Sequence, residues 1–158
     1  MNMLRVDDRL IHGQVIIGWL GQMNFDNLVL IHDDIPEDII ELYGNMLSGS
    51  INYIPFDAGK DKELIINHNH SHFFIVKNIP FLKINLNVIS DCKISLLNIG
   101  GLRSVENKIK LLDFVYMSKQ EMEDLLFIKN TLKCRVNARE LPYSNEFDII
   151  RIIEEKEI

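Results

Sequence analysis

Short apolar runs separated by segments of helix length are the feature that most constrains this chain. Residues 28–31 (LVLI) form a continuous apolar run, which is typical of a strand buried on both faces of a parallel sheet. Comparable runs recur along the chain, and strands are expected at 3–6, 28–31, 51–56, 72–77, 93–99, 114–117 and 134–136. The alternation predicts an α/β fold with an open, mostly parallel six- or seven-stranded sheet and helices on both faces.

Helix signals fall between these runs. Residues 14–23 are apolar on most sides, Pro36 is followed by acids, and Ser118 has Glu121 three residues later, which is a capping box. Helices are therefore expected at 14–23, at 57–67, and from Pro36, Asn78, Ser118 and Asn145.

Composition limits the class of protein. A chain of 158 residues with 47% hydrophobic and 25% charged residues is expected to form a single domain over 1–158. The net charge of −6 argues against nonspecific nucleic-acid binding. Cys92 and Cys134 form no C-x-x-C pair, and no apolar run approaches the roughly 18 residues that span a bilayer. We expect a cytoplasmic protein.

Ionisable residues are concentrated between the first apolar run and the helix after it. The loop 7–12 (DDRLIH) leaves the first strand, as 32–34, 77–78 and 100–101 leave later ones. Ligands in open parallel sheets bind beyond the carboxyl ends of the strands. These polar segments are thus expected to meet at one edge of the sheet, where Arg5, Arg9 or Arg139 could form a basic pocket.

His12 is the reactive group that this loop offers. An imidazole at a helix N-terminus faces free backbone N–H groups, so a neutral ring can attack and a phosphohistidine product can be held. Arg9 can reach the same oxygens with a planar donor fork. Asp7 and Asp8 can orient Arg9, fix the loop or hold the imidazole tautomer, and Gly13 lets the backbone approach without a side chain. The same residue types also suit a surface ion pair between Asp8 and Arg9, with His12 merely beginning a helix.

A resemblance to a known family makes the prediction for His12 more specific. Residues 5–15 (RVDDRLIHGQV) resemble the signature of the IIB component of the mannose/fructose/sorbose family of the bacterial phosphoenolpyruvate-dependent sugar phosphotransferase system. The likeness continues at 29–34 (VLIHDD), 97–101 (LNIGG) and 139–142 (RELP). It departs at 83–91, which lack a glycine-rich segment, and at 57–72, which are rich in Asn and His.

The resemblance implies a phosphoryl carrier, a protein-histidine phosphotransferase. Such a protein accepts phosphate on His12 from a phosphohistidine IIA protein and passes it to a hexose-class sugar entering through the IIC/IID membrane permease, with which it associates peripherally. It implies no cofactor and no metal, makes both cysteines bystanders, and leaves a homo-oligomer open. The implied site comprises catalytic His12 and Arg9, supported by Arg5, Asp7, Asp8, Gly13, Asp33, Gly100, Gly101 and Arg139.

Three alternatives stay open. A paralogue with the same fold could act as a regulatory or protein-binding module without catalysis. Arg139 could form a surface salt bridge instead of serving as a second phosphoryl ligand. His68, His70 and His72 alternate and could bind a metal on a strand, although a solvated loop suits their Asn-rich surroundings better.

Overall fold

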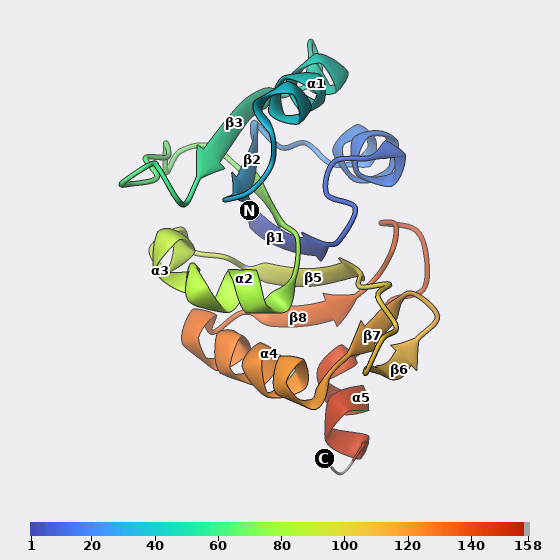
Figure 1. Ribbon diagram of the computed structural model, residues 1–158. Helices are drawn as coiled ribbons and strands as arrows, with labels where there is room; N and C mark the ends of the chain where they lie inside the picture. The colour runs from blue at the N-terminus through green and yellow to red at the C-terminus, as the bar shows by residue number, and fades with distance from the viewer. Residues whose placement is uncertain (157–158) are drawn as a thin grey trace.

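A central parallel sheet organises the computed structural model, which describes residues 1–156. Its strand order is β3-β2-β4-β1-β5-β8, and every pairing in it is parallel (Figure 1). The strands are β1 (Asn2–Asp7), β2 (Asn27–His32), β3 (Asn52–Asp57), β4 (His72–Val76), β5 (Leu96–Gly101) and β8 (Arg135–Ala138). β1, β2 and β4 are buried along almost their whole length, as their continuous apolar runs predict.

Helices cover both faces of the sheet and bury two separate apolar cores. One face packs against η1 (Gln14–Leu20) and α1 (Glu37–Leu47). The opposite face packs against α2 (Ile79–Ile84), α3 (Leu86–Ile89), α4 (Lys119–Leu132) and α5 (Ile149–Glu155). Among residues 1–156, no helix is long and apolar enough to cross a membrane. The expected α/β architecture is confirmed.

The neighbouring strands β1 and β4 feed helices on opposite faces. β1 leads into η1 on one face, and β4 leads into α2 on the other. Loops that diverge in this way leave a crevice at the carboxyl ends of the strands, where open α/β sheets bind ligands. The loop 8–13 lies at this position, so the fold exposes its polar residues at a favourable place for chemistry.

Two expectations about strands and helices are wrong in detail. The run at 114–117 does not join the main sheet, because β7 (Val115–Met117) pairs antiparallel with β6 (Ile109–Leu112) in a separate hairpin. The connector 57–67 is not helical. The Asp57 carboxylate accepts the Gly59 N–H, and the Asp61 carboxylate accepts the Asp57 N–H. These bonds accompany a single turn, in which the Asp57 carbonyl accepts the Lys60 and Asp61 N–H groups, and the chain does not continue it as a helix.

Two helix boundaries also differ. The first helix is a π-helix over Gln14–Leu20, a form that often occurs at functional sites. The C-terminal helix begins at Ile149 because Asp148 caps it by accepting the Arg151 N–H, rather than at Asn145. The capping box of Ser118 and Glu121 is present as expected and begins α4.

Candidate active site

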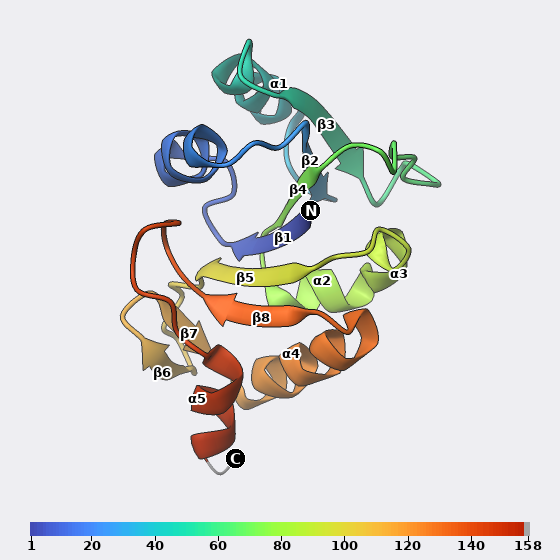
Figure 2. The same cartoon turned by 180° about the vertical axis from the view of Figure 1, so that it is seen from behind.

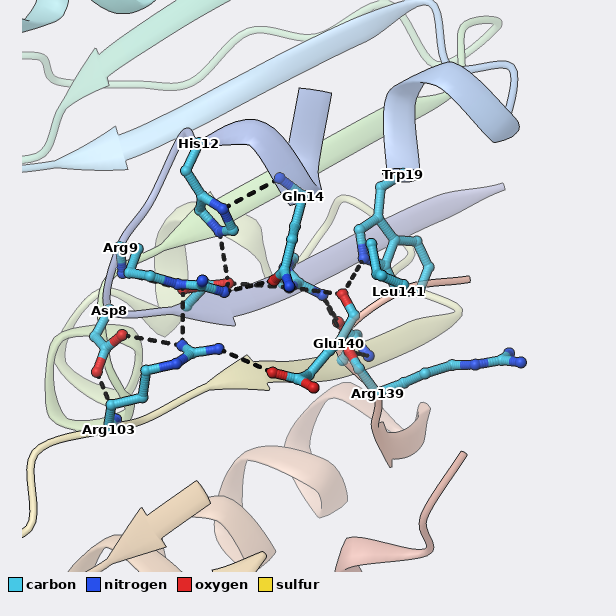
Figure 3. A network of polar contacts seen from close by, with 12 residues as sticks. Asp8, Arg9, His12, Gln14, Trp19, Arg103, Arg139, Glu140 and Leu141 are labelled. Atoms are coloured by element: carbon cyan, nitrogen blue, oxygen red, sulfur yellow. Dashed lines mark hydrogen bonds and ion pairs between the residues drawn. The ribbon is translucent and has the colours of Figure 1, made fainter. Parts of the chain in front are cut away.

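His12 lies in the loop between β1 and η1, with its ring fixed at both nitrogens (Figure 3). Its Nε2 is 3.0 Å from Asp7 Oδ2, and the Gln14 backbone N–H lies 3.3 Å from its Nδ1. A backbone N–H can only donate, so Nδ1 accepts and Nε2 carries the proton that is shared with Asp7. The geometry therefore selects the neutral tautomer whose lone pair is on Nδ1.

Asp7 is the buried acid at the centre of the cluster. Its side chain is 0% exposed and accepts hydrogen bonds from Arg5 Nη2 at 2.9 Å and from the Arg9 backbone N–H at 3.0 Å. Burial alone would raise the pKa of Asp7. The hydrogen bond from His12, the charge of Arg5 and the Arg9 N–H outweigh burial and hold the pKa of this carboxyl well below its usual range. Asp7 is thus ionised at neutral pH.

Arg5 lies fully buried behind Asp7. Its guanidinium donates to Asn98 Oδ1 at 2.6 Å, to the Arg139 carbonyl at 3.2 Å and to the Glu140 carbonyl at 3.1 Å. Burial lowers the pKa of Arg5 to about 10, against the opposing charge of Asp7, so the group stays protonated at neutral pH. A side chain on Gly100 would overlap this guanidinium. Arg5 therefore supports Asp7 from inside the protein and does not form an open basic pocket.

Arg9 is the cation on the solvent side of His12. Its side chain is 36% exposed, and its Nη2 donates to Gln14 Oε1 at 2.7 Å. Its contacts with Asp7 are longer, at 3.4 Å. Figure 3 shows the Arg9 guanidinium and the Gln14 side chain meeting beside the His12 ring. The Gln14 N–H thus lies at the nitrogen that is free to react, and the Arg9 fork lies between the Gln14 side chain and the Asp7 carboxylate that holds Nε2.

Arg103 is a member of the cluster that sequence reasoning missed. Its Nη1 lies 3.6 Å from Asp7 Oδ1 and 3.4 Å from Asp8 Oδ1, and its Nη2 lies 3.3 Å from Glu140 Oε1. Gly101 makes room for it, because a Cβ there would overlap the guanidinium. Its place two residues after Gly100-Gly101, just beyond the carboxyl end of β5, was the available signal.

Other expected site residues lie elsewhere. The Arg139 guanidinium points away from His12 (Figure 3), donates to the Ser144 carbonyl at 2.7 Å and pairs with Glu146 at 3.6 Å. In this arrangement Arg139 forms a salt bridge and does not lie beside His12. Asp33 pairs with Lys77 in a neighbouring loop. A Cβ on Gly13 would meet nothing within 4 Å, so the space beside it is open.

His72 and the two cysteines are kept from such chemistry. His72 is fully buried on β4 rather than in a solvated loop, and its ring lies between Asn2 and Asn27. Burial raises the pKa of the Cys92 thiol to about 11 and also raises the pKa of Cys134. Neither thiol is therefore a ready nucleophile at neutral pH.

Residues 1–158 match the family described as the sorbose subfamily of IIB components of the phosphotransferase system. The chain belongs to this family. It is 27% identical, over 131 residues, to the N-acetylgalactosamine-specific phosphotransferase enzyme IIB component 1 of Escherichia coli (strain K12), covering 79% of this chain and 81% of that protein.

Solved structures share the fold. A protein described as manxB from Thermoanaerobacter tengcongensis superposes with a TM-score of 0.77 at 24% identity, covering 98% of this chain and 96% of that one. The IIBSor domain of the sorbose permease from Klebsiella pneumoniae superposes with a TM-score of 0.74 at 21% identity, covering 98% of both chains. This IIB component is thus a phosphotransferase-system protein of sugar transport with the fold of that family.

Proposed function

We propose that this IIB component, acting as a single domain over 1–158, carries a phosphoryl group on His12 Nδ1. It receives the group from a phosphohistidine on a IIA protein and gives it to a hexose-class sugar during uptake through IIC/IID membrane components, at the cytoplasmic side of the permease. The observation that carries the proposal is the Nε2–Asp7 hydrogen bond of 3.0 Å, which leaves the Nδ1 lone pair as the nucleophile.

Each transfer exchanges one P–N or P–O bond for another. In the first, the Nδ1 lone pair of His12 attacks the donor's phosphorus, the donor P–N bond breaks, and the donor imidazole departs with the electron pair. In the second, a sugar hydroxyl attacks, the P–Nδ1 bond breaks, the electron pair returns to Nδ1, and the hydroxyl proton is released. Asp7 stabilises the ring when it is phosphorylated, because its carboxylate faces the protonated Nε2.

Charge stabilisation is the protein's other task. Phosphoryl transfer requires alignment of donor and acceptor and stabilisation of the charge on the transferred oxygens. The Gln14 N–H, which now donates to Nδ1, can turn to a phosphoryl oxygen once Nδ1 is bonded to phosphorus. The Arg9 fork, half-exposed and anchored at Gln14 Oε1, can supply charge-assisted hydrogen bonds to the same oxygens.

Phosphoryl labelling tests the proposal. Incubation with phosphoenolpyruvate, the general phosphotransferase proteins and the cognate IIA should give an acid-labile, base-stable phosphate on the wild type. His12→Ala should take no label, whereas His70→Ala, which changes an exposed histidine, should label normally. Nitrogen-15 NMR of the product should assign the phosphate to Nδ1. Failure of the wild type to take label from a verified cognate IIA would support a non-catalytic, protein-binding module instead.

A further inference from the structure

Arg103 joins two loops that surround His12. Its guanidinium contacts Asp7 and Asp8 at the end of β1, and Glu140 in the loop 139–145 after β8. Figure 2 shows this loop rising beyond the end of β8 towards the blue helix η1. Arg103 is therefore the ionic link between the loop that holds His12 and the loop that packs on η1.

The backbone near Arg103 makes the same connection. The Arg103 N–H donates to Asp8 Oδ2 at 2.6 Å, and the Asp8 N–H donates to the Gly101 carbonyl at 3.0 Å. The first residue of the His12 loop is thus held by its backbone and its carboxylate at residues 101–103. Arg103 is 30% exposed, so its side chain can respond to changes at the site surface.

Arg103 also affects how Arg9 is placed. Asp7 Oδ1 faces the Arg9 backbone N–H at 3.0 Å, Arg9 Nε at 3.4 Å and Arg103 Nη1 at 3.6 Å. A carboxylate oxygen accepts about two good hydrogen bonds, so the two guanidinium groups compete for this atom. Arg9 makes its short contact elsewhere, at Oε1 of Gln14 (2.7 Å), the residue whose backbone N–H faces the reactive nitrogen.

We propose that Arg103 is a positioning residue for phosphoryl transfer. By placing a second charge beside Asp7 Oδ1 and fixing Asp8, it keeps the Arg9 contact with Asp7 long, leaves the Arg9 fork on Gln14 and keeps the His12 ring in its Nε2-protonated tautomer. Without Arg103, Arg9 closes onto Asp7 and leaves Gln14, away from the transferred group. This inference rests on the function proposed above.

Gly101 provides a way to test the guanidinium's place without removing its charge. A Cβ on Gly101 would overlap Arg103 Nη1, and Gly101 has no positive φ that would strain an alanine backbone. Gly101→Ala should therefore displace the Arg103 side chain. If that displacement is its only effect, Gly101→Ala should not slow phosphoryl transfer further in a protein that already carries Arg103→Ala.

The experiment measures single-turnover transfer from phosphorylated IIA to Arg103→Gln, Arg103→Lys, Gly101→Ala and Arg103→Ala, and to the Gly101→Ala/Arg103→Ala double variant. Arg103→Gln and Gly101→Ala should each lower the maximal rate by about 10- to 100-fold, the usual cost of misplaced groups, with the donor KM unchanged. Arg103→Lys should recover part of the rate. The double variant should be as slow as Arg103→Ala alone. Arg135→Gln, which removes an exposed arginine paired with Glu146, is the matched control and should keep the wild-type rate.

Nitrogen-15 NMR of the His12 ring gives a second readout that needs no donor. The unphosphorylated wild type should show the Nε2-protonated tautomer, and Arg103→Gln should show a mixture of tautomers. An unchanged maximal rate, an effect on KM alone, or additive slowing in the double variant would overturn the proposal. If the wild type takes no label, the proposed carrier function fails. The ring tautomer alone then tests whether Arg103 positions His12. An unchanged tautomer in Arg103→Gln would reject the positioning role of Arg103.

Discussion

His12 and His72 occupy opposite edges of the same sheet and are used in different ways. His12 follows the carboxyl end of β1, and His72 begins β4 at the amino edge. Both rings have hydrogen-bond partners at both nitrogens. The His72 Nδ1 donates to Asn2 Oδ1 at 3.2 Å, and its Nε2 accepts from Asn27 Nδ2 at 3.1 Å.

The hydrogen-bond partners and the exposure of the two imidazoles differ. His12 has an ionised acid on Nε2, a single backbone N–H on Nδ1 and a side chain that is 17% exposed. His72 has two side-chain amides and no exposure. Burial lowers the pKa of His72, so its neutral form is kept in the core. His12 thus offers an accessible lone pair beside an ionised acid, and His72 does not.

Separate replacement of the two histidines should give the largest difference between phosphoryl labelling and stability. His12→Ala should reduce phosphoryl labelling by more than about 10³-fold, because the nucleophile is gone, and should leave the fold intact. His72→Leu should label normally but lower the free energy of unfolding by about 1–3 kcal/mol, because a buried Asn27 donor loses its acceptor. Labelling and urea unfolding followed by Trp19 fluorescence measure the two effects. Phosphoryl labelling of the His12→Ala protein would contradict the assignment of His12 as the nucleophile.

The charged partner is the next point to test. Asp7→Asn should lower the free energy of unfolding by about 3–5 kcal/mol, because Arg5 is left as a buried charge without an ion partner. Arg5→Met combined with Asp7→Asn should be less destabilised than Asp7→Asn alone, since the buried charge is then absent. Urea unfolding compares the variants. A double variant that is the less stable of the two would show that Arg5 is stabilised mainly by Asn98 and the carbonyl groups.

Arg9 should have a smaller effect, confined to transfer. Arg9→Ala should fold normally and slow transfer by about 10-fold or more, because one charged contact to the transition state is lost. Asn52→Ala is the matched variant at the amino edge, where Asn52 donates to Asn27 Oδ1 at 2.7 Å, and it should leave the rate unchanged. Rapid-quench labelling measures both. Equal rates for Arg9→Ala and the wild type would remove Arg9 from the mechanism.

His72 and Asp7, at the two edges of the sheet, should contribute to the free energy of unfolding in different pH ranges. The pKa of His72 is lowered on folding, so its contribution is complete above the unfolded value of about 6.5 and declines as pH falls below it. The pKa of Asp7 is also lowered on folding, but its contribution is complete above about pH 4 and is lost only in stronger acid. Urea unfolding across pH should show two separate declines. His72→Leu should lack the upper one and Asp7→Asn the lower one.

The smallest effect is expected at the cysteines. The carbonyl of Cys92 accepts the Asn2 side-chain N–H at the amino edge, and burial raises the pKa of its thiol to about 11. Cys92→Ala and Cys134→Ala should therefore keep wild-type labelling, and a thiol-blocking reagent should not slow the native protein. Loss of label in either variant would point to a thiol on the phosphoryl route.

Much of this arrangement could be predicted because it depends on local patterns. Continuous apolar runs such as 28–31 require burial on both faces, and that requirement fixed the parallel sheet. The loop 7–12 was predicted as the site because its charged residues follow a strand directly. Arg103 could not be predicted in the same way, because its partners Asp7 and Glu140 are distant in sequence and only folding brings them together. The helix expected at 57–67 is absent, because hydrogen bonds of the Asp57 and Asp61 side chains stabilise a single turn there.

The buried guanidinium of Arg5 has a consequence for how the protein is made. It is fixed by the Glu140 carbonyl, 135 positions further along the chain. Contacts so distant in sequence form late, since a long loop must close first. The His12 loop is synthesised before its support, which is complete only after β8 and the loop that follows it have been made and docked. A nascent chain that lacks these residues therefore holds its histidine without the contacts that fix Arg5 behind it.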